Sequence, residues 1–176
     1  MQITVTRRKV FLHPKYDVHQ NGVLIYFGGT EFGLIWQVQF FEKKGERPAM
    51  IIDFGYTITR WDNNVLNFNG RLGDYQCYCG QDNYRIYQQK GIRYTVYKND
   101  MQVAWLGITN ETLFGVREYT ITANSDVDVP LVAAFCVILD NIYQLSNPAI
   151  SPGLTVDLGN ISAPPFNEDW KPDDGL

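Results

Sequence analysis

The segment Asp126–Tyr143, with the sequence DVDVPLVAAFCVILDNIY, decides the fold of this chain. From Val129 to Leu139 it has no polar side chain, so it is apolar all round, which is typical of a helix buried on every side. At about 1.5 Å per residue these eleven residues span roughly 16 Å, whereas a bilayer needs about 20 apolar residues. The segment therefore predicts a core helix over about 128–142 and no transmembrane segment.

The start of this helix is marked by residues that suit a first turn. Pro130 is tolerated only there, because proline has no N–H to donate further along a helix. Ser125 or Asp126 can cap the turn, and Asp128 places a negative charge near the positive end of the helix dipole. We expect the helix to begin near Asp128 or Val129.

The chain before the helix consists of short strand-like segments separated by turn signals. Asn21-Gly22 is a strong hairpin signal, Lys98-Asn99-Asp100 is a tight turn, and Gly28-Gly29 indicates a further turn. About ten to twelve strands with turns every 8–12 residues favour a sandwich or a barrel. A closed barrel leaves no exposed edge, and an apolar helix after the last strand would fill a wide lumen. The sequence predicts a mainly β fold, a closed antiparallel β-barrel of about twelve strands around one central hydrophobic C-terminal helix.

The chain divides into a barrel and a tail. Residues 1–145 are the predicted barrel domain with its helix, and 176 residues are enough for one domain with a sizeable core. Residues 146–176 are rich in proline and glycine and end in acidic residues, so we expect an extended or partly disordered arm that Trp170 can pin to the body.

Composition limits the function classes. The chain is 45% hydrophobic and 14% aromatic, as in globular proteins, and its net charge of −4 does not favour nucleic acid as a partner. No long apolar run follows the basic residues near the N-terminus, so we expect no signal peptide. An odd number of cysteines without an export signal favours a reducing compartment, and we expect a cytoplasmic protein.

Few residues suggest chemistry. Cys77 and Cys79 point the same way on a strand, but a zinc site needs two further ligands, and Cys136 lies in the predicted helix. Core or surface thiols are therefore favoured over a metal or redox role. His13 and His19 have no nucleophile motif nearby. We expect no enzymatic activity, no cofactor and no metal.

Two small basic clusters are the candidate binding residues. They can contact lipid phosphates, with ordinary solvated faces as the alternative reading. Their members are Arg7, Arg8, Lys9, Lys43, Lys44 and Arg47.

Two segments carry a family resemblance. Tyr94–Ile108 (YTVYKNDMQVAWLGI) has a strand, polar turn, strand pattern, and Tyr119–Asp140 has a closing strand and an apolar helix with an acidic residue at its exit. Over about residues 10–143 the chain resembles the LURP-one-related proteins of the tubby C-terminal-like superfamily, which also includes the phospholipid scramblases. The calcium-binding segment and palmitoylated cysteine cluster of scramblases are not found.

The resemblance implies a fold and a function. The family's fold is a twelve-stranded barrel around a central hydrophobic helix. The implied function is non-enzymatic binding of a phospholipid headgroup or a protein, at the periphery of a membrane. The alternatives are an interaction or inhibitor module that uses the tail as a docking arm, and a small-ligand cup, which a helix in the lumen would exclude.

Overall fold

The computed structural model describes residues 1–10, 13–31, 37–42, 47–53, 57–60, 65–71, 74–89, 93–112, 116–146, 164, 167 and 169–173. Twelve strands precede one helix in the described chain. They are β1 (Gln2–Val10), β2 (His13–Gln20), β3 (Val23–Glu31), β4 (Gln37–Glu42), β5 (Pro48–Asp53), β6 (Thr57–Arg60), β7 (Val65–Arg71), β8 (Asp74–Cys79), β9 (Asp82–Gln89), β10 (Arg93–Lys98), β11 (Met101–Glu111) and β12 (Arg117–Ala123), followed by α1 (Val129–Ser146).

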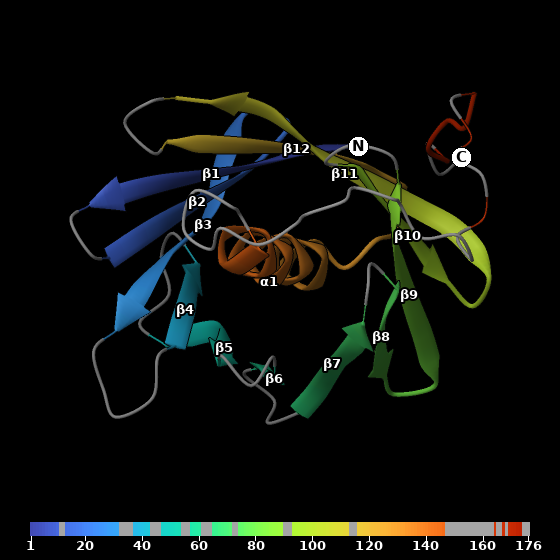
Figure 1. The fold of residues 1–176 in the computed structure, drawn as a ribbon, viewed down its shortest axis with the longest axis horizontal. Helices are drawn as coiled ribbons and strands as arrows, with labels where there is room; N and C mark the ends of the chain where they lie inside the picture. Colours follow the sequence, from blue (N-terminus) through green and yellow to red (C-terminus); the bar gives the residue numbers. More distant parts are fainter. Residues whose placement is uncertain are drawn as a thin grey trace.

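The strands close into an antiparallel barrel, as predicted. Each strand pairs with the next in the sequence, and β1 pairs with β12, with Ile3 opposite Ile121 and Val5 opposite Tyr119. Figure 1 shows α1 nearly end-on in the middle of this ring. Because neighbours in sequence are neighbours in space, β3 and β9 lie on opposite walls of the barrel (Figure 1).

Turn chemistry explains two of the hairpins. Asn21 and Gly22 have φ values of 48° and 80°, and Asn99 and Asp100 have φ values of 49° and 67°. Two successive residues with positive φ give the twist that joins antiparallel strands tightly, and asparagine, aspartate and glycine tolerate it best. These two turns were predicted correctly.

The turn predicted at Gly28-Gly29 is wrong, because both residues lie inside β3. Gly28 pairs with Phe40 of β4, and a Cβ added at Gly28 would stand 2.4 Å from the carbonyl oxygen of Gln39. The glycine is therefore needed for a close approach of two strands and not for a change of direction.

Helix α1 fills the lumen, as the apolar segment predicted. All residues from Leu131 to Asp140 are buried, and the ring of Phe135 meets Tyr84 of β9 edge-on at 5.7 Å. The helix begins at Val129 and continues to Ser146, four residues beyond the predicted end. In the described part of the chain, no helix combines the length and the apolarity that a membrane crossing requires.

Asp128 caps the helix, and neither Ser125 nor Asp126 does. Its Oδ1 accepts a hydrogen bond from the N–H of Leu131 at 3.1 Å, the position that an N-cap side chain serves. The same carboxylate pairs with Arg60 of β6, so the first turn of α1 is tied to the barrel wall.

The tail contacts the barrel where it is described. The carbonyl oxygen of Pro164 accepts a hydrogen bond from Gln89 of β9, and Asp173 is bonded to the connection between β12 and α1. Residues 147–163, on which much of the expected extended arm falls, lie outside the described residues.

Candidate functional site

A cluster of charged and phenolic side chains is buried inside the barrel beside the second half of α1. Its centre is Asp140, which is 1% exposed. Arg117 of β12 donates from Nη1 to Asp140 Oδ1 at 2.7 Å, and Arg7 of β1 holds Nε 3.3 Å from Oδ2. Tyr16 of β2 donates its hydroxyl to Oδ2 at 3.2 Å, and Tyr119 of β12 donates to Oδ1. One carboxylate therefore connects three adjacent strands to the helix.

Burial and charge shift the pKa of each acidic group around this carboxylate in the same direction. Burial, and then the negative charge of Asp140, raises the pKa of the Tyr16 and Tyr119 hydroxyls well above the ordinary value. The same two causes raise the pKa of the Cys136 thiol. Burial alone would lower the pKa of Arg117, but its hydrogen bond to Glu111 and the neighbouring Tyr119 and Asp140 raise it overall.

The cluster is built to hold the fold. Two buried guanidinium groups face Asp140, and Glu111, whose side chain is about half exposed, accepts from Arg117 and completes the charge balance. The phenols stay protonated hydrogen-bond donors and the thiol stays neutral, so none of them is activated as a nucleophile. We interpret the cluster as a structural lock between β1, β2, β12 and α1.

The predicted basic residues do not form one site. Arg7, proposed as a lipid-phosphate contact, is buried in the lock, whereas its neighbour Arg8 points outward and is 60% exposed. Arg47 is exposed just before β5. The side chains of Lys9, Lys43 and Lys44 lie outside the described residues. Strand alternation is the reason for the split between Arg7 and Arg8.

The outer wall over β1–β5 combines cations with aromatic rings. Lys15 of β2, which the sequence analysis did not single out, is exposed and pairs in register with Arg8. Phe27 of β3 is 42% exposed and stacks on Phe41 of β4, with ring centroids 5.8 Å apart. Phe41 pairs with Pro48, the residue after Arg47. We call Arg8, Lys15, Phe27, Phe41 and Arg47 the basic-aromatic wall.

Two carboxylates moderate the charge of this wall. Asp17, which pairs in register with Phe27, forms an ion pair with Arg8, and Glu42 at the end of β4 is exposed. Among its described side chains the wall thus carries three cations and two anions, a net charge of +1 within a chain whose net charge is −4.

The remaining residues that the sequence suggested have structural places. Cys77 is buried, and burial raises its pKa to about 12, so its thiol is not reactive. Cys79 is partly buried beside the core, and His19 lies half-buried on β2. Within the described residues, no three side chains of His, Cys, Asp or Glu are placed together to hold a metal ion.

The tyrosines of β8, β9 and β10, between residues 75 and 97, divide between the two faces of the barrel sheet. Tyr75, Tyr84 and Tyr94 point inward and join the core. Tyr87 and Tyr97 point outward and meet edge-on, with ring centroids 5.7 Å apart. The run therefore serves cross-strand packing on both sides of the sheet.

Comparisons of the chain with family models, with curated proteins and with solved structures each gave no match.

Proposed function

We propose that this protein is a non-enzymatic binding barrel, related to the tubby C-terminal-like proteins, that attaches reversibly to an anionic phospholipid surface through its basic-aromatic wall. The observation that carries the proposal is the Phe27–Phe41 stack, in which Phe27 is exposed, with Arg8 and Lys15 on one side and Arg47 on the other. Cations recognise lipid phosphates, and aromatic rings favour the membrane–water interface.

The shape of the site favours a surface over a pocket. The lumen is filled by α1, whose residues Leu131–Asp140 are buried, so a ligand has to bind outside the barrel. Arg8 on β1 and Arg47 before β5 are four strand spacings apart, or about 19 Å along the wall at about 4.8 Å per strand. A single headgroup phosphate cannot touch both, so the cations meet different lipids.

The expected affinity is weak. A Phe side chain carries about 200 Å² of surface, so the 42% of Phe27 that is exposed corresponds to about 80 Å² and about 2 kcal/mol of apolar transfer. A basic residue near an anionic surface contributes about 1 kcal/mol, and the net charge of the wall allows about that amount. A total of about 3 kcal/mol gives reversible attachment that one added or lost charge changes noticeably.

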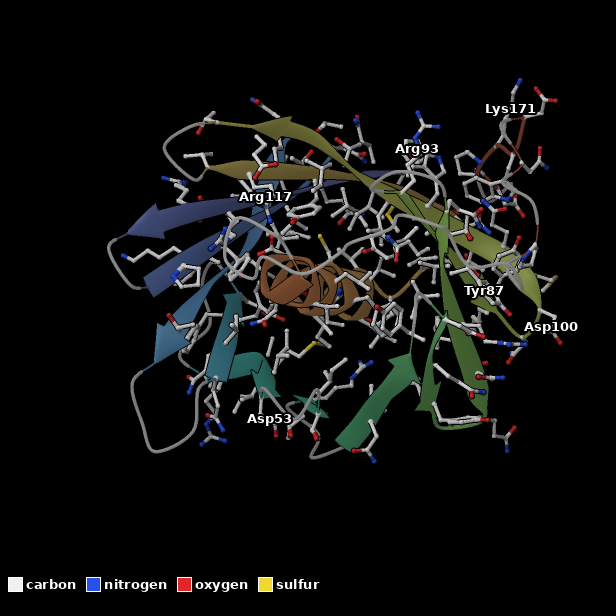
Figure 2. The ribbon with its side chains drawn as sticks, viewed as in Figure 1. Asp53, Tyr87, Arg93, Asp100, Arg117 and Lys171 are labelled. Carbon is white, nitrogen blue, oxygen red and sulfur yellow. The ribbon has the colours of Figure 1, made fainter. Side chains whose placement is uncertain are left out.

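Liposome co-sedimentation tests the proposal. We expect binding to vesicles containing phosphatidylserine or a phosphoinositide, little binding to neutral vesicles, and weaker binding at higher salt. Arg8→Glu reverses the charge of the wall and should abolish binding, whereas Asp17→Asn removes the partner of Arg8 and should strengthen it about fivefold. Lys171→Glu, on an exposed residue of the tail (Figure 2), is the charge-matched control and should leave binding unchanged.

Two results would contradict the proposal. Equal losses in Arg8→Glu and Lys171→Glu would mean that only the net charge of the chain matters. Absence of binding to every vesicle would favour the alternative, a protein-interaction module. That alternative used residues 146–176 as a docking arm, and the described tail residues instead contact the barrel of their own chain.

A further inference from the structure

Strand β3 carries two of the four exposed large apolar side chains of the described residues. Val23 is 61% exposed and Phe27 is 42% exposed, whereas the other two, Tyr78 and Met101, lie on β8 and β11. Val23 is the first residue of β3 and follows the Asn21-Gly22 turn directly. It therefore lies at the tip of the β2–β3 hairpin, beyond the residues that define the basic-aromatic wall.

A partly exposed leucine links this tip to the wall. Leu24 pairs in register with His19 of β2, which pairs in register with Thr4 of β1. Thr4 stands between two core residues that are 0% exposed, so Thr4 and the residues directly opposite it across the sheet point outward. The apolar surface of the wall therefore continues along β3 from Phe27 through Leu24 to the hairpin tip.

The β2–β3 hairpin tip is free of permanent charge, and polar groups of its turn are bonded within the protein. Between Val18 and Thr30 the sequence has His19 but no Asp, Glu, Lys or Arg. The N–H of Asn21 donates to the carbonyl oxygen of Gln2 at 2.9 Å, and Oδ1 of Asn21 accepts from the N–H of Gln2 at 3.2 Å. Polar groups that already have partners cost little to move out of water, so this tip suits a membrane interface.

The β10–β11 hairpin is the comparison that isolates charge, because its turn has the same backbone geometry. Its two turn residues also have positive φ, and Met101, which is 70% exposed, follows them as Val23 follows the other turn. This second tip is charged, since Asp100 lies in the turn and Lys98 pairs with Asp82 beside it at 3.0 Å. Charged groups are costly to move toward acyl chains, so the β10–β11 tip does not suit a membrane interface.

We propose that the tip of the β2–β3 hairpin is a second lipid contact, which inserts Val23 shallowly into the same phospholipid surface that the basic-aromatic wall binds. The inference rests on the proposed function and adds to it the residue that enters the apolar side of the interface. The cations of the wall stay at the level of the lipid phosphates, Val23 and Phe27 lie toward the acyl chains, and the β10–β11 tip stays in water.

The tip and the wall can meet one flat surface together. Val23 lies four residues from Phe27 on one continuous strand, which is up to about 13 Å at about 3.3 Å per residue. The strands that carry the cations Arg8 and Lys15 are one and two places from β3 in the ring. By contrast, β11 is four places from β3 in the ring of twelve, so a surface that lies against β3 leaves Met101 in water.

The contribution of Val23 is large enough to measure. Transfer of a valine side chain that is 61% exposed from water to an apolar environment corresponds to about a tenfold change in affinity. Val23→Thr keeps the shape of the side chain and replaces a methyl group by a hydroxyl group, so it should weaken binding about fivefold. Val23→Glu adds a charge and should abolish binding, whereas Val23→Trp should strengthen it about fivefold, because tryptophan favours the membrane–water interface.

Co-sedimentation of the full chain with vesicles of phosphatidylcholine and phosphatidylserine tests these expectations. The same three substitutions at Met101 are the matched controls, because Met101 is as exposed as Val23 and follows a turn of the same geometry. We expect the three Met101 variants to bind within about twofold of the wild type.

A depth measurement uses vesicles whose acyl chains carry bromine, which quenches nearby tryptophan fluorescence. Val23→Trp and Met101→Trp each add one tryptophan to the four of the wild type. We expect the added tryptophan of Val23→Trp to be quenched when the vesicles bind, and that of Met101→Trp to keep its emission.

The outcomes separate this inference from the proposed function. If the wild type binds the vesicles but the Val23 and Met101 variants bind equally, or if the added tryptophan of Val23→Trp is not quenched, the hairpin-tip contact is overturned and attachment through the wall stands. If the wild type binds no vesicle, the proposed function is overturned and the tip contact with it. Stronger binding by Val23→Trp cannot result from unfolding, so the inference stays testable even if Val23→Thr or Val23→Glu folds poorly.

Discussion

Replacing Asp140 by asparagine tests the interpretation of the buried cluster as a structural lock. The substitution keeps the shape of the side chain and removes its charge. Oδ1 of an asparagine can still accept from Arg117 and Tyr119, but its NH₂ group would face Tyr16 and Arg7, which now approach Oδ2. Asp140→Asn therefore leaves two buried guanidinium groups without the carboxylate that they share.

The expected loss is large relative to the stability of a domain. Removing one partner of a buried ion pair costs about 3–5 kcal/mol, and Glu111, which also accepts from Arg117, places this case near about 3 kcal/mol. Single domains have about 5–15 kcal/mol of unfolding free energy. With a urea m-value of about 2 kcal/mol/M, the unfolding midpoint should fall by about 1.5 M.

Urea unfolding followed by tryptophan fluorescence measures this shift. Asp169→Asn, the same chemical change on an exposed tail residue, is the control and should change stability by less than about 0.5 kcal/mol. Adding Arg7→Met to Asp140→Asn removes one of the two guanidinium charges that lose the shared carboxylate and should recover part of the loss. A loss below about 1 kcal/mol for Asp140→Asn, or no recovery in the double variant, would refute the lock.

Three further predictions concern the core and the pairing of β3 with β4. Ala134→Asp places an unpaired carboxylate on a residue of α1 that is 0% exposed, so it should cost several kcal/mol, roughly, and a urea midpoint equal to that of the wild type would contradict the central helix. Gly28→Ala should destabilise the fold by about 1–3 kcal/mol, because its Cβ would meet the Gln39 carbonyl oxygen at 2.4 Å. Gly29→Ala is the control and should be close to neutral, because its Cβ would lie 3.7 Å from the nearest atom, Cγ of Lys15. Equal urea midpoints for the two variants would contradict the close approach of β3 and β4. Burial raises the pKa of both Cys77 and Tyr84 to about 12, so the folded chain keeps protons that the unfolded chain loses. The free energy of unfolding should be constant up to about pH 8 and fall from about pH 9 toward 12, by at most about 1.4 kcal/mol per pH unit for each proton. A urea midpoint that stays level from about pH 8 to about pH 11 would contradict this prediction.

The barrel and its helix could be predicted because their signals are local. An apolar run without a polar face, from Val129 to Leu139, admits few solutions other than burial on all sides. The turns at Asn21-Gly22 and Asn99-Asp100 need positive φ, and their residue types show it directly. The turn predicted at Gly28-Gly29 was wrong, because a glycine needed for close strand approach has the same sequence signature as a glycine in a turn.

The lock was only partly predictable. Ile3, Val5 and Arg7 alternate with polar residues, so strand periodicity alone indicates that Arg7 points inward and Arg8 outward. The prediction that Arg7, Arg8 and Lys9 form one basic cluster did not take this alternation into account. The partner of Arg7 was not predictable, because Asp140 is 133 positions away and only the closed ring brings β1 beside α1.

Trp170 suggested that the tail contacts the body, but the contacts at Pro164 and Asp173 had no signal in the sequence. The barrel holds Pro164 and Asp173 by their backbone groups, and every residue has a carbonyl oxygen and nearly every residue an N–H. On the receiving side, Tyr87, Gln89 and Thr95 occupy the positions that strand alternation assigns to solvent. Of these three residues, Gln89 has a printed partner in the tail, the carbonyl oxygen of Pro164, which is 75 positions away.

A barrel whose lumen is filled by its own helix has only its outer surface left for binding. In this chain two opposite parts of that surface differ in the exposure of their outward-pointing aromatic side chains, which strand alternation alone does not explain. Over β1–β5 the ring of Phe27 is 42% exposed next to cations, whereas Tyr87 on the outer side of β9 is 5% exposed. The ring of Tyr87 lies against Arg85, which is already paired with Asp74, so the wall over β1–β5 is the better candidate for binding.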